Sequence, residues 1–116
     1  MTITRLDLSK RLAGAVRHND TLYISGQTAD NVTGSVGEQT REVLAKIDAL
    51  LAQGGSSKDK LLMVNIWLPN IADFDEMNAA YDAWLDKDNM PARATVEARL
   101  AISDLRVEIA AIAATD

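Results

Sequence analysis

The sequence contains no cysteine among its 116 residues. That absence excludes disulfides, thiolate nucleophiles, zinc knuckles and iron–sulfur clusters. The chain also has a single histidine, His18, and no cluster of His, Asp and Glu at metal-ligand spacing, so we expect no metal site. Because no glycine-rich loop leads into a helix, the sequence predicts no bound cofactor. His18 adjoins a turn signal at Asn19-Asp20 and is interpreted as an ordinary hairpin residue.

Long hydrophobic runs are absent as well. The longest lies within residues 61–68 and is interrupted by Asn65, whereas a membrane span needs about 20 apolar residues. The first seven residues have no apolar core of the secretory type, so we expect a cytoplasmic protein with no membrane partner. Basic residues are in the minority, 12 against 17 acidic ones, and the net charge is -5. A nucleic-acid binder needs the opposite sign, so the charge argues against a nucleic-acid partner.

The remaining composition is that of a globular protein, with 47% hydrophobic and 25% charged residues. We expect a single domain over residues 1–116. Alternating apolar and polar residues predict strands, and apolar residues at three- and four-residue steps predict helices. The pairs Ser35/Glu38 and Asp73/Glu76 have the spacing of capping boxes at helix starts. The expected strands cover residues 2–8, 15–18, 21–25, 61–68, 94–100 and 105–113, with a turn at Ser103-Asp104 before the last. The first expected helix begins at Ser35 and ends at Gly54-Gly55. The second begins at Asp73, and its buried stripe consists of Phe74, Met77, Tyr81, Trp84 and Leu85.

This order of elements predicts an α+β fold, a single layer of about six strands with two helices on one face. Residues 61–68 are apolar on both faces, so that strand is expected inside the sheet, with Leu62, Val64, Ile66 and Leu68 on one side. The other sheet face would carry Met63, Trp67, Ala110 and Ile112. No third helix is available to cover it, and self-association is the simplest way to bury it.

Three features are candidates for chemistry. Arg93 follows Pro91 at the start of a strand, where its planar fork can face a carboxylate or phosphate; pairing with Glu97 is the structural alternative. Glu108 is a lone acid within an apolar strand, so it lies either on a wet face or partly buried where it can transfer protons. The segment Ser25-Gly26-Gln27 ends a strand with small polar groups that can hold an oxygen atom.

These residues also carry a family resemblance. The motifs are Pro91-Ala92-Arg93-Ala94-Thr95-Val96-Glu97, Val107-Glu108-Ile109-Ala110-Ala111-Ile112-Ala113, Tyr23-Ile24-Ser25-Gly26-Gln27 and Asp73-Phe74-Asp75-Glu76-Met77-Asn78-Ala79-Ala80-Tyr81. Together they run over nearly the whole chain and resemble the Rid (YjgF) family of reactive-intermediate deaminases, closest to its YoaB-like branch.

The resemblance implies a chorismate-mutase-like (ferredoxin-like) fold and a homotrimer with sites in the clefts between subunits. It also implies hydrolysis of enamine or imine intermediates of the 2-aminoacrylate class to 2-keto acids and ammonia, without a cofactor. In that mechanism Arg93 binds the substrate carboxylate and Glu108 positions the water. The other positions that line the cleft are Ser25, Gly26, Asn78 and Thr95. The sequence departs from the family pattern at Thr95, where many members have Cys, near Leu12, where many have a Tyr, and in a shorter loop over residues 28–37.

Two other functions compete with the deaminase. The first is a non-catalytic protein that binds 2-keto acids at the same cleft and regulates a partner; the missing Tyr near Leu12 favours it, whereas Arg93 together with Glu108 favours the enzyme. The second is an RNA-acting translation inhibitor, a role attached to the family name, which the net charge of -5 argues against.

Overall fold

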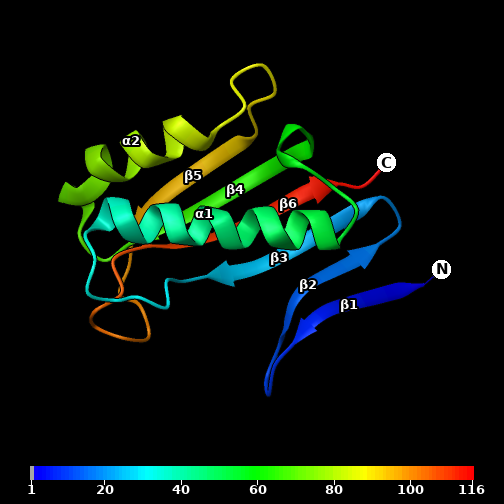
Figure 1. Cartoon of the computed structure of the whole chain (residues 1–116), viewed down its shortest axis with the longest axis horizontal. Coiled ribbons are helices and arrows are strands. Elements are labelled where there is room, and N and C mark those ends of the chain that lie inside the picture. Colours follow the sequence, from blue (N-terminus) through cyan, green and yellow to red (C-terminus); the bar gives the residue numbers. More distant parts are fainter. Residues whose placement is uncertain (1) are drawn as a thin grey trace.

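The computed structural model describes residues 2–116 and confirms the α+β class (Figure 1). One six-stranded sheet has the order β1-β2-β3-β6-β4-β5; only β4 and β5 pair in parallel. Both helices lie over the same face of the sheet. The strands are β1 (Ile3–Leu8), β2 (Ala13–His18), β3 (Thr21–Gln27), β4 (Leu61–Leu68), β5 (Ala92–Glu97) and β6 (Glu108–Ala114). The helices are α1 (Val36–Gln53) and α2 (Phe74–Trp84), with short 3₁₀ turns η1 (Lys58–Lys60) and η2 (Ile71–Asp73).

Helix α1 begins where the sequence predicts it. The Ser35 side chain accepts a hydrogen bond from the Glu38 N–H at 3.2 Å, and the Glu38 carboxylate accepts one from the Ser35 N–H at 2.9 Å. This capping box satisfies two backbone donors that the first turn cannot pair internally. The helix ends at Gly54, and its buried stripe of Val43, Leu44, Ile47, Leu50 and Leu51 packs on the sheet.

The start of α2 differs from the prediction. Asp73 makes no capping hydrogen bond with its side chain, because η2 precedes the helix and leads the chain into it. Asn70 instead accepts from the Ala72 N–H at 3.0 Å. Glu76 accepts from the Gly37 N–H at 3.0 Å and so joins α2 to the start of α1. Phe74 is also less buried than its place in the stripe suggests, with 37% of its surface exposed.

A turn lies at Ser103-Asp104 as predicted, with the Leu105 N–H donating to the Ile102 carbonyl at 3.1 Å, but the two C-terminal strands on either side of it do not pair as a hairpin. Strand β5 ends at Glu97, and residues 98–107 form a loop before β6. Strand β6 lies between β3 and β4 and forms backbone hydrogen bonds with both of them. Strand β5 pairs only with β4 and forms one edge of the sheet. Pairing between elements distant in the chain leaves no local signal in the sequence.

Strand β4 has the predicted bounds and lies inside the sheet. Its first two residues reverse the predicted faces: Leu61 is buried and Leu62 is 51% exposed. The register with β6 shifts between Leu61 and Met63, which is a bulge that turns Leu62 outward. From Val64 onward the predicted alternation holds, and Val64, Ile66 and Leu68 are buried beneath the helices.

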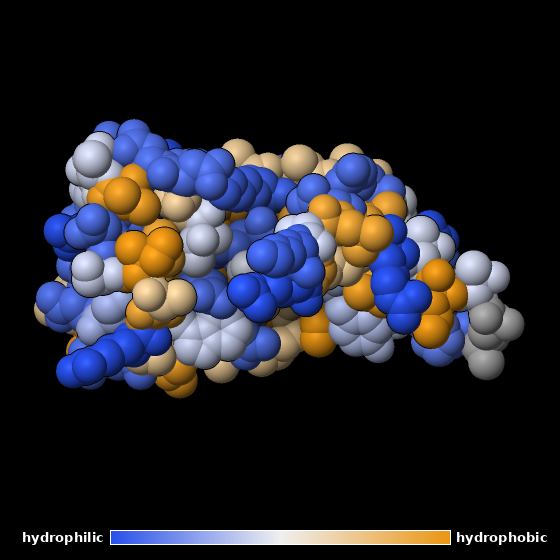
Figure 2. Space-filling model, turned by 90° about the horizontal axis from the view of Figure 1, so that it is seen from below, coloured by the Kyte–Doolittle hydropathy of each residue, from blue (hydrophilic) through white to orange (hydrophobic). Residues whose placement is uncertain are grey.

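The sheet face opposite the helices has no covering layer. We call it the open sheet face; it carries Val16, Tyr23, Met63, Asn65, Trp67, Glu108, Ala110 and Ile112, which the strand registers place on adjoining strands. None of these side chains is buried, and Tyr23 is 48% exposed. On the side of the molecule viewed in Figure 2, hydrophobic residues interrupt the hydrophilic surface in several places. No helix within residues 2–116 has both the length and the hydropathy that a bilayer crossing demands.

Candidate active site

Arg93 is fixed at the β5 edge of the sheet by three side chains of α2. Its partner in the parallel ladder is the buried Val64, so its side chain lies on the helix-covered side. The Arg93 Nη1 donates a hydrogen bond to Asn78 Oδ1 at 2.7 Å. The guanidinium carbon lies 4.9 Å from the Tyr81 ring centroid and 5.8 Å from that of Phe74. Stacking on aromatic faces and one side-chain acceptor hold the fork in a single orientation.

The positive charge of Arg93 has no counter-ion within residues 2–116. The sequence offers Glu97 as an ion-pair partner for Arg93, but the Glu97 carboxylate instead accepts a hydrogen bond from the Ile71 N–H at 3.0 Å. The ion pairs of the described chain involve other residues. A guanidinium has five N–H donors, and the hydrogen bond to Asn78 uses one. The remaining donors are available to an external carboxylate.

A surface hollow of about 210 Å³ adjoins Arg93. It is lined by Tyr81, Asp82, Leu85, Met90, Pro91 and Arg93. Burial raises the pKa of the Tyr81 phenol above its usual value, Arg93 acts against that rise, and Asp82 adds to it. The phenol is therefore neutral at pH 7 and does not neutralise Arg93.

Thr95 lies two residues beyond Arg93 on the same side of β5, opposite Ile66 of β4. Its Oγ1 is buried without a hydrogen-bond partner in the described part of the chain. A hydroxyl shielded in this way costs free energy until it finds a partner. Arg93, Asn78 and Thr95 therefore form one group, on the helix-covered side of the β5 edge.

Glu108 belongs to a second group, on the open sheet face. It is half-buried and lies opposite Trp67 of β4. Its carboxylate rests against Gly26: a Cβ atom at residue 26 would overlap Glu108 Oε2, so glycine allows this close approach. The register of β3 with β6 shifts between Ile24 and Gln27, which is the bulge that contains Gly26.

Ser25 shares that bulge but is engaged elsewhere. Its hydroxyl donates to the Gly14 carbonyl at 3.0 Å and accepts from Gln27 Nε2 at 3.2 Å. The segment Ser25-Gly26-Gln27 is thus more than a simple strand exit, because its side chains tie β3 to β2 and its glycine seats Glu108.

A single chain keeps the two groups apart. Between Arg93 and Glu108 lie two strand spacings, about 10 Å, and three residues along β4, roughly another 10 Å. Their side chains also lie on opposite faces of the sheet. Of the six residues that the sequence singles out, the structure brings together Arg93, Asn78 and Thr95, and separately Ser25, Gly26 and Glu108.

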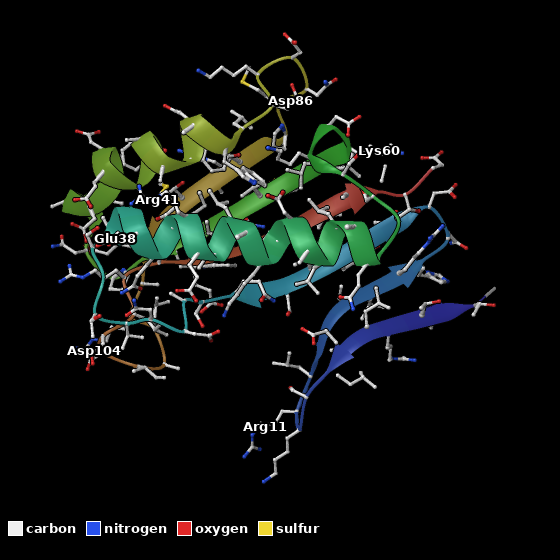
Figure 3. All side chains as sticks on the ribbon, viewed as in Figure 1. Arg11, Glu38, Arg41, Lys60, Asp86 and Asp104 are labelled. Carbon is white, nitrogen blue, oxygen red and sulfur yellow. The ribbon has the colours of Figure 1, made fainter. Side chains whose placement is uncertain are left out.

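The bend between β1 and β2, where the resemblance leads one to look for a Tyr, is also distant from Arg93. It lies at the opposite edge of the sheet from β5, and Arg11 at the bend points away from the body of the molecule (Figure 3). Leu12 is 56% exposed there. His18 ends β2, half-buried and paired with Ile3 and Thr21. Within residues 2–116, no three His, Asp or Glu side chains gather as metal ligands.

Tyr81 and Phe74 were assigned to the core by sequence reasoning, which missed their contact with Arg93. The available signal was the helical spacing of Phe74, Asn78 and Tyr81, which places all three on one face of α2.

A family model described as Endoribonuclease L-PSP matches residues 2–115. The chain is 42% identical over 114 residues to the RutC family protein YoaB of Escherichia coli (strain K12), covering 98% of this chain and 99% of that protein. A solved structure from Neisseria meningitidis, described as a member of the YjgF protein family, has a TM-score of 0.96 and 41% identity over 100% of this chain and 97% of that one. A Pseudomonas aeruginosa protein described as uncharacterized has a TM-score of 0.95 and 36% identity over 99% and 100% of the two chains.

Fold and site thus define a small α+β protein of the chorismate-mutase-like class, with a fixed arginine at one sheet edge and a glutamate on the open sheet face. The chain belongs to the Rid (YjgF) family, in its YoaB-like branch.

Proposed function

We propose that the protein hydrolyses reactive enamine and imine intermediates of the 2-aminoacrylate class to 2-keto acids and ammonia. The observation that carries this proposal is Arg93, which Asn78 and two aromatic rings hold in place while its charge has no counter-ion in the described chain. Such a group binds the carboxylate that every 2-imino acid carries. Thr95 lies two residues further along the same side of β5, and its buried Oγ1 would become a second donor where the substrate reaches it.

The reaction needs no covalent nucleophile, because an imine carbon is already electrophilic. An enamine first takes a proton at its terminal carbon and becomes the iminium. Water then adds to C2 and loses a proton, giving a carbinolamine. The C–N bond breaks as the nitrogen takes up a proton and the hydroxyl group releases its own, so that ammonia departs and a ketone remains at C2. Glu108 accepts the proton from water and returns one to the departing nitrogen. The Glu108 carboxylate packs against Gly26, which holds it in position.

A homotrimer is part of the proposal. In one chain Arg93 and Glu108 lie on opposite sheet faces, so a cleft between subunits is the arrangement that brings both to one substrate. The open sheet face provides the apolar surface that association would bury. In this proposal a neighbouring copy also contacts the exposed β1–β2 bend with Leu12, which extends away from the body of the molecule.

The test measures ammonia release from imines that an amino-acid oxidase generates in the assay. Arg93→Lys keeps the charge but loses the two-pronged geometry, and should lower kcat/KM by at least tenfold. Glu108→Gln keeps the shape and should lower turnover by roughly 10²–10⁴-fold while 2-keto acid binding survives. Arg99→Lys and Glu97→Gln are the matched controls. Full activity in both test variants would refute these roles.

The alternative is a non-catalytic 2-keto acid binding protein, which the absence of a Tyr near Leu12 favours. It predicts 2-keto acid binding that depends on Arg93 with no release of ammonia above background. Since the family description contains the word endoribonuclease, the same preparation should also be incubated with RNA. We expect neither cleavage nor binding at physiological salt, given the net charge of -5.

A further inference from the structure

We propose that Gln39 is a positioning residue for the proposed reaction, because it fixes the chain segment from which Glu108 extends. This inference rests on the proposed function, since Gln39 acts on the reaction only through Glu108. Gln39 lies near the start of α1, and 1% of its surface is exposed. A buried amide needs hydrogen-bond partners for its donors and its acceptor. One of them is the Gly34 carbonyl, which lies 3.4 Å from Gln39 Nε2.

Both ends of the Gln39 amide contact the loop that precedes β6. Gln39 Nε2 donates to the Asp104 carbonyl at 3.1 Å, and Gln39 Oε1 accepts from the Arg106 N–H at 2.9 Å. These two bonds flank Leu105 as the backbone of a neighbouring parallel strand would. In Figure 3 the loop that carries Asp104 lies next to the end of α1 where Glu38 is labelled.

Glu108 depends on this loop because it is the first residue of β6. In the sheet it pairs with Trp67 of β4, whereas the ladder with β3 reaches only to Ile109. The end of a strand opens more readily than its middle. Within residues 2–116, the side-chain hydrogen bonds to the backbone of residues 99–107 both come from Gln39. Its amide therefore anchors the chain just before Glu108.

Other contacts hold this loop less specifically. Leu105 and Val107 are buried, but burial of apolar surface has no preferred direction. Arg106 Nη1 lies 3.9 Å from Asp73 Oδ2, and the Arg106 side chain is 54% exposed, so this ion pair contributes little. The Gln39 amide, in contrast, fixes the loop backbone at two points and so fixes the direction in which β6 begins.

The experiment compares Gln39→Met with Thr40→Val in the ammonia-release assay, below the unfolding temperature of each variant. Gln39→Met keeps the length of the side chain and removes both bonds to the loop. Thr40 is also buried in α1, but its hydroxyl donates to the Val36 carbonyl at 2.7 Å within the helix, so Thr40→Val leaves the loop held. We expect kcat of Gln39→Met to fall by about tenfold to 10²-fold, the cost of a small misplacement, with KM within about twofold of the wild type. KM is spared because α2 holds Arg93.

Gln39→Glu provides a rescue that depends on pH. A protonated carboxyl has one donor and one acceptor, so it can replace both bonds to the loop, whereas a carboxylate cannot donate. Burial raises the pKa of such a carboxyl. The ratio of wild-type to variant kcat should therefore fall as the pH is lowered. A variant that stays as slow at low pH as at high pH would contradict the role of these hydrogen bonds.

The outcomes separate the positioning role from the proposed function. Unchanged kcat in Gln39→Met, or an equal loss in Thr40→Val, would overturn the positioning role while deamination stands. If the wild type hydrolyses no imine, the proposed function fails, and NMR decides the positioning role. The nuclear Overhauser contact between Gly26 Hα and Glu108 Hγ should be present in the wild type and in Thr40→Val and lost in Gln39→Met. A contact that persists in Gln39→Met would overturn the inference.

If the Gln39 variants do not fold, amide hydrogen exchange in the wild type decides. The Arg106 N–H should be protected to the same degree as the amides of β6, which would show that the loop and the strand open as one unit. Exchange of the Arg106 N–H at the rate of an unstructured amide would overturn the inference.

Discussion

At the scale of single residues, the two halves of the candidate site are built differently. Arg93 is oriented by side chains of α2, through one hydrogen bond and two aromatic contacts. The Glu108 carboxylate packs into the space that a side chain at residue 26 would fill and that Gly26 leaves empty. Both devices fix a charged group while leaving its charge available, which is what binding and proton transfer require.

The contact between Glu108 and Gly26 means that Gly26→Ala tests whether the position of the Glu108 carboxylate matters for turnover. The new methyl group would overlap Glu108 Oε2, and the flexible carboxylate would rotate away. We expect turnover to fall by about 10²-fold, because a displaced general base loses its alignment with water. The free energy of unfolding should change by less than about 1 kcal/mol, since the clash is with the end of a side chain.

Ammonia release and urea denaturation measure the two quantities. Gly34→Ala is the matched control, because its new Cβ would lie 3.1 Å from the Glu38 Cβ, away from both site groups. Unchanged turnover in Gly26→Ala would show that the position of Glu108 does not matter for the reaction.

At the scale of elements, helix α1 and strand β4 could be predicted almost residue by residue. Their signals are local: the capping box at Ser35, the apolar stripe behind it, and the apolar run bounded by Pro69. The faces of β4 were misassigned only at the bulge near Leu61, because register shifts depend on the partner strand. Likewise, nothing beside Ser103 in the sequence reveals that β6 pairs with β3 and β4.

The site was predicted less completely, for the same reason. The residue types of Arg93 and Glu108 stood out in their segments, and the resemblance added Asn78 and Thr95. That Asn78 orients Arg93 follows only from the packing of α2 over the β5 edge. That Arg93 and Glu108 lie on opposite faces follows only from their registers with β4.

The capping box of α1 carries a prediction with a pH dependence. Ser35→Ala should lower the free energy of unfolding by about 1 kcal/mol at pH 7, the usual cost of losing such a cap. The backbone N–H and the hydroxyl of Ser35 lower the pKa of Glu38. A carboxyl whose folded pKa is lowered stabilises the fold above its unfolded pKa, and loses that effect as pH falls through the folded one.

Urea denaturation at pH 7 and pH 3 checks both points. Glu38→Gln should be less stable than the wild type at pH 7, and the difference should narrow as the pH falls toward 3 and Glu38 begins to take up its proton. Asp82→Asn, in the exposed face of α2, is the control for a general charge effect. A difference that is the same at both pH values would contradict this account.

At the scale of the whole molecule, the arrangement has two unlike sides. The helices bury one sheet face, whereas the open sheet face presents half-buried apolar residues such as Met63, Trp67 and Ile112. The two halves of the candidate site lie on different sides of the same sheet. Association through the open sheet face would cover this second apolar surface, as the proposed trimer requires.

We expect light scattering at micromolar concentration to give three times the chain mass of 12.6 kDa. Ile112→Lys should dissociate the trimer, because burying an unpaired ammonium in an apolar interface is unfavourable. Ala45→Lys, on the exposed side of α1, adds the same charge and should leave the mass unchanged. A wild-type monomer, or a trimer that tolerates Ile112→Lys, would argue against this interface.

The position of β6 has a consequence for biosynthesis. Of the six described strands, the last in chain order, β6, is the one that joins β3 to β4 in the middle of the sheet. Until residues 108–114 emerge, the nascent chain consists of a three-stranded N-terminal segment and a β4–β5 pair, with no ladder between them. The sheet therefore closes only after residues 108–114 have been synthesised. A chain that stops before residue 108 lacks this strand and leaves the facing edges of β3 and β4 unpaired, which favours aggregation and proteolysis.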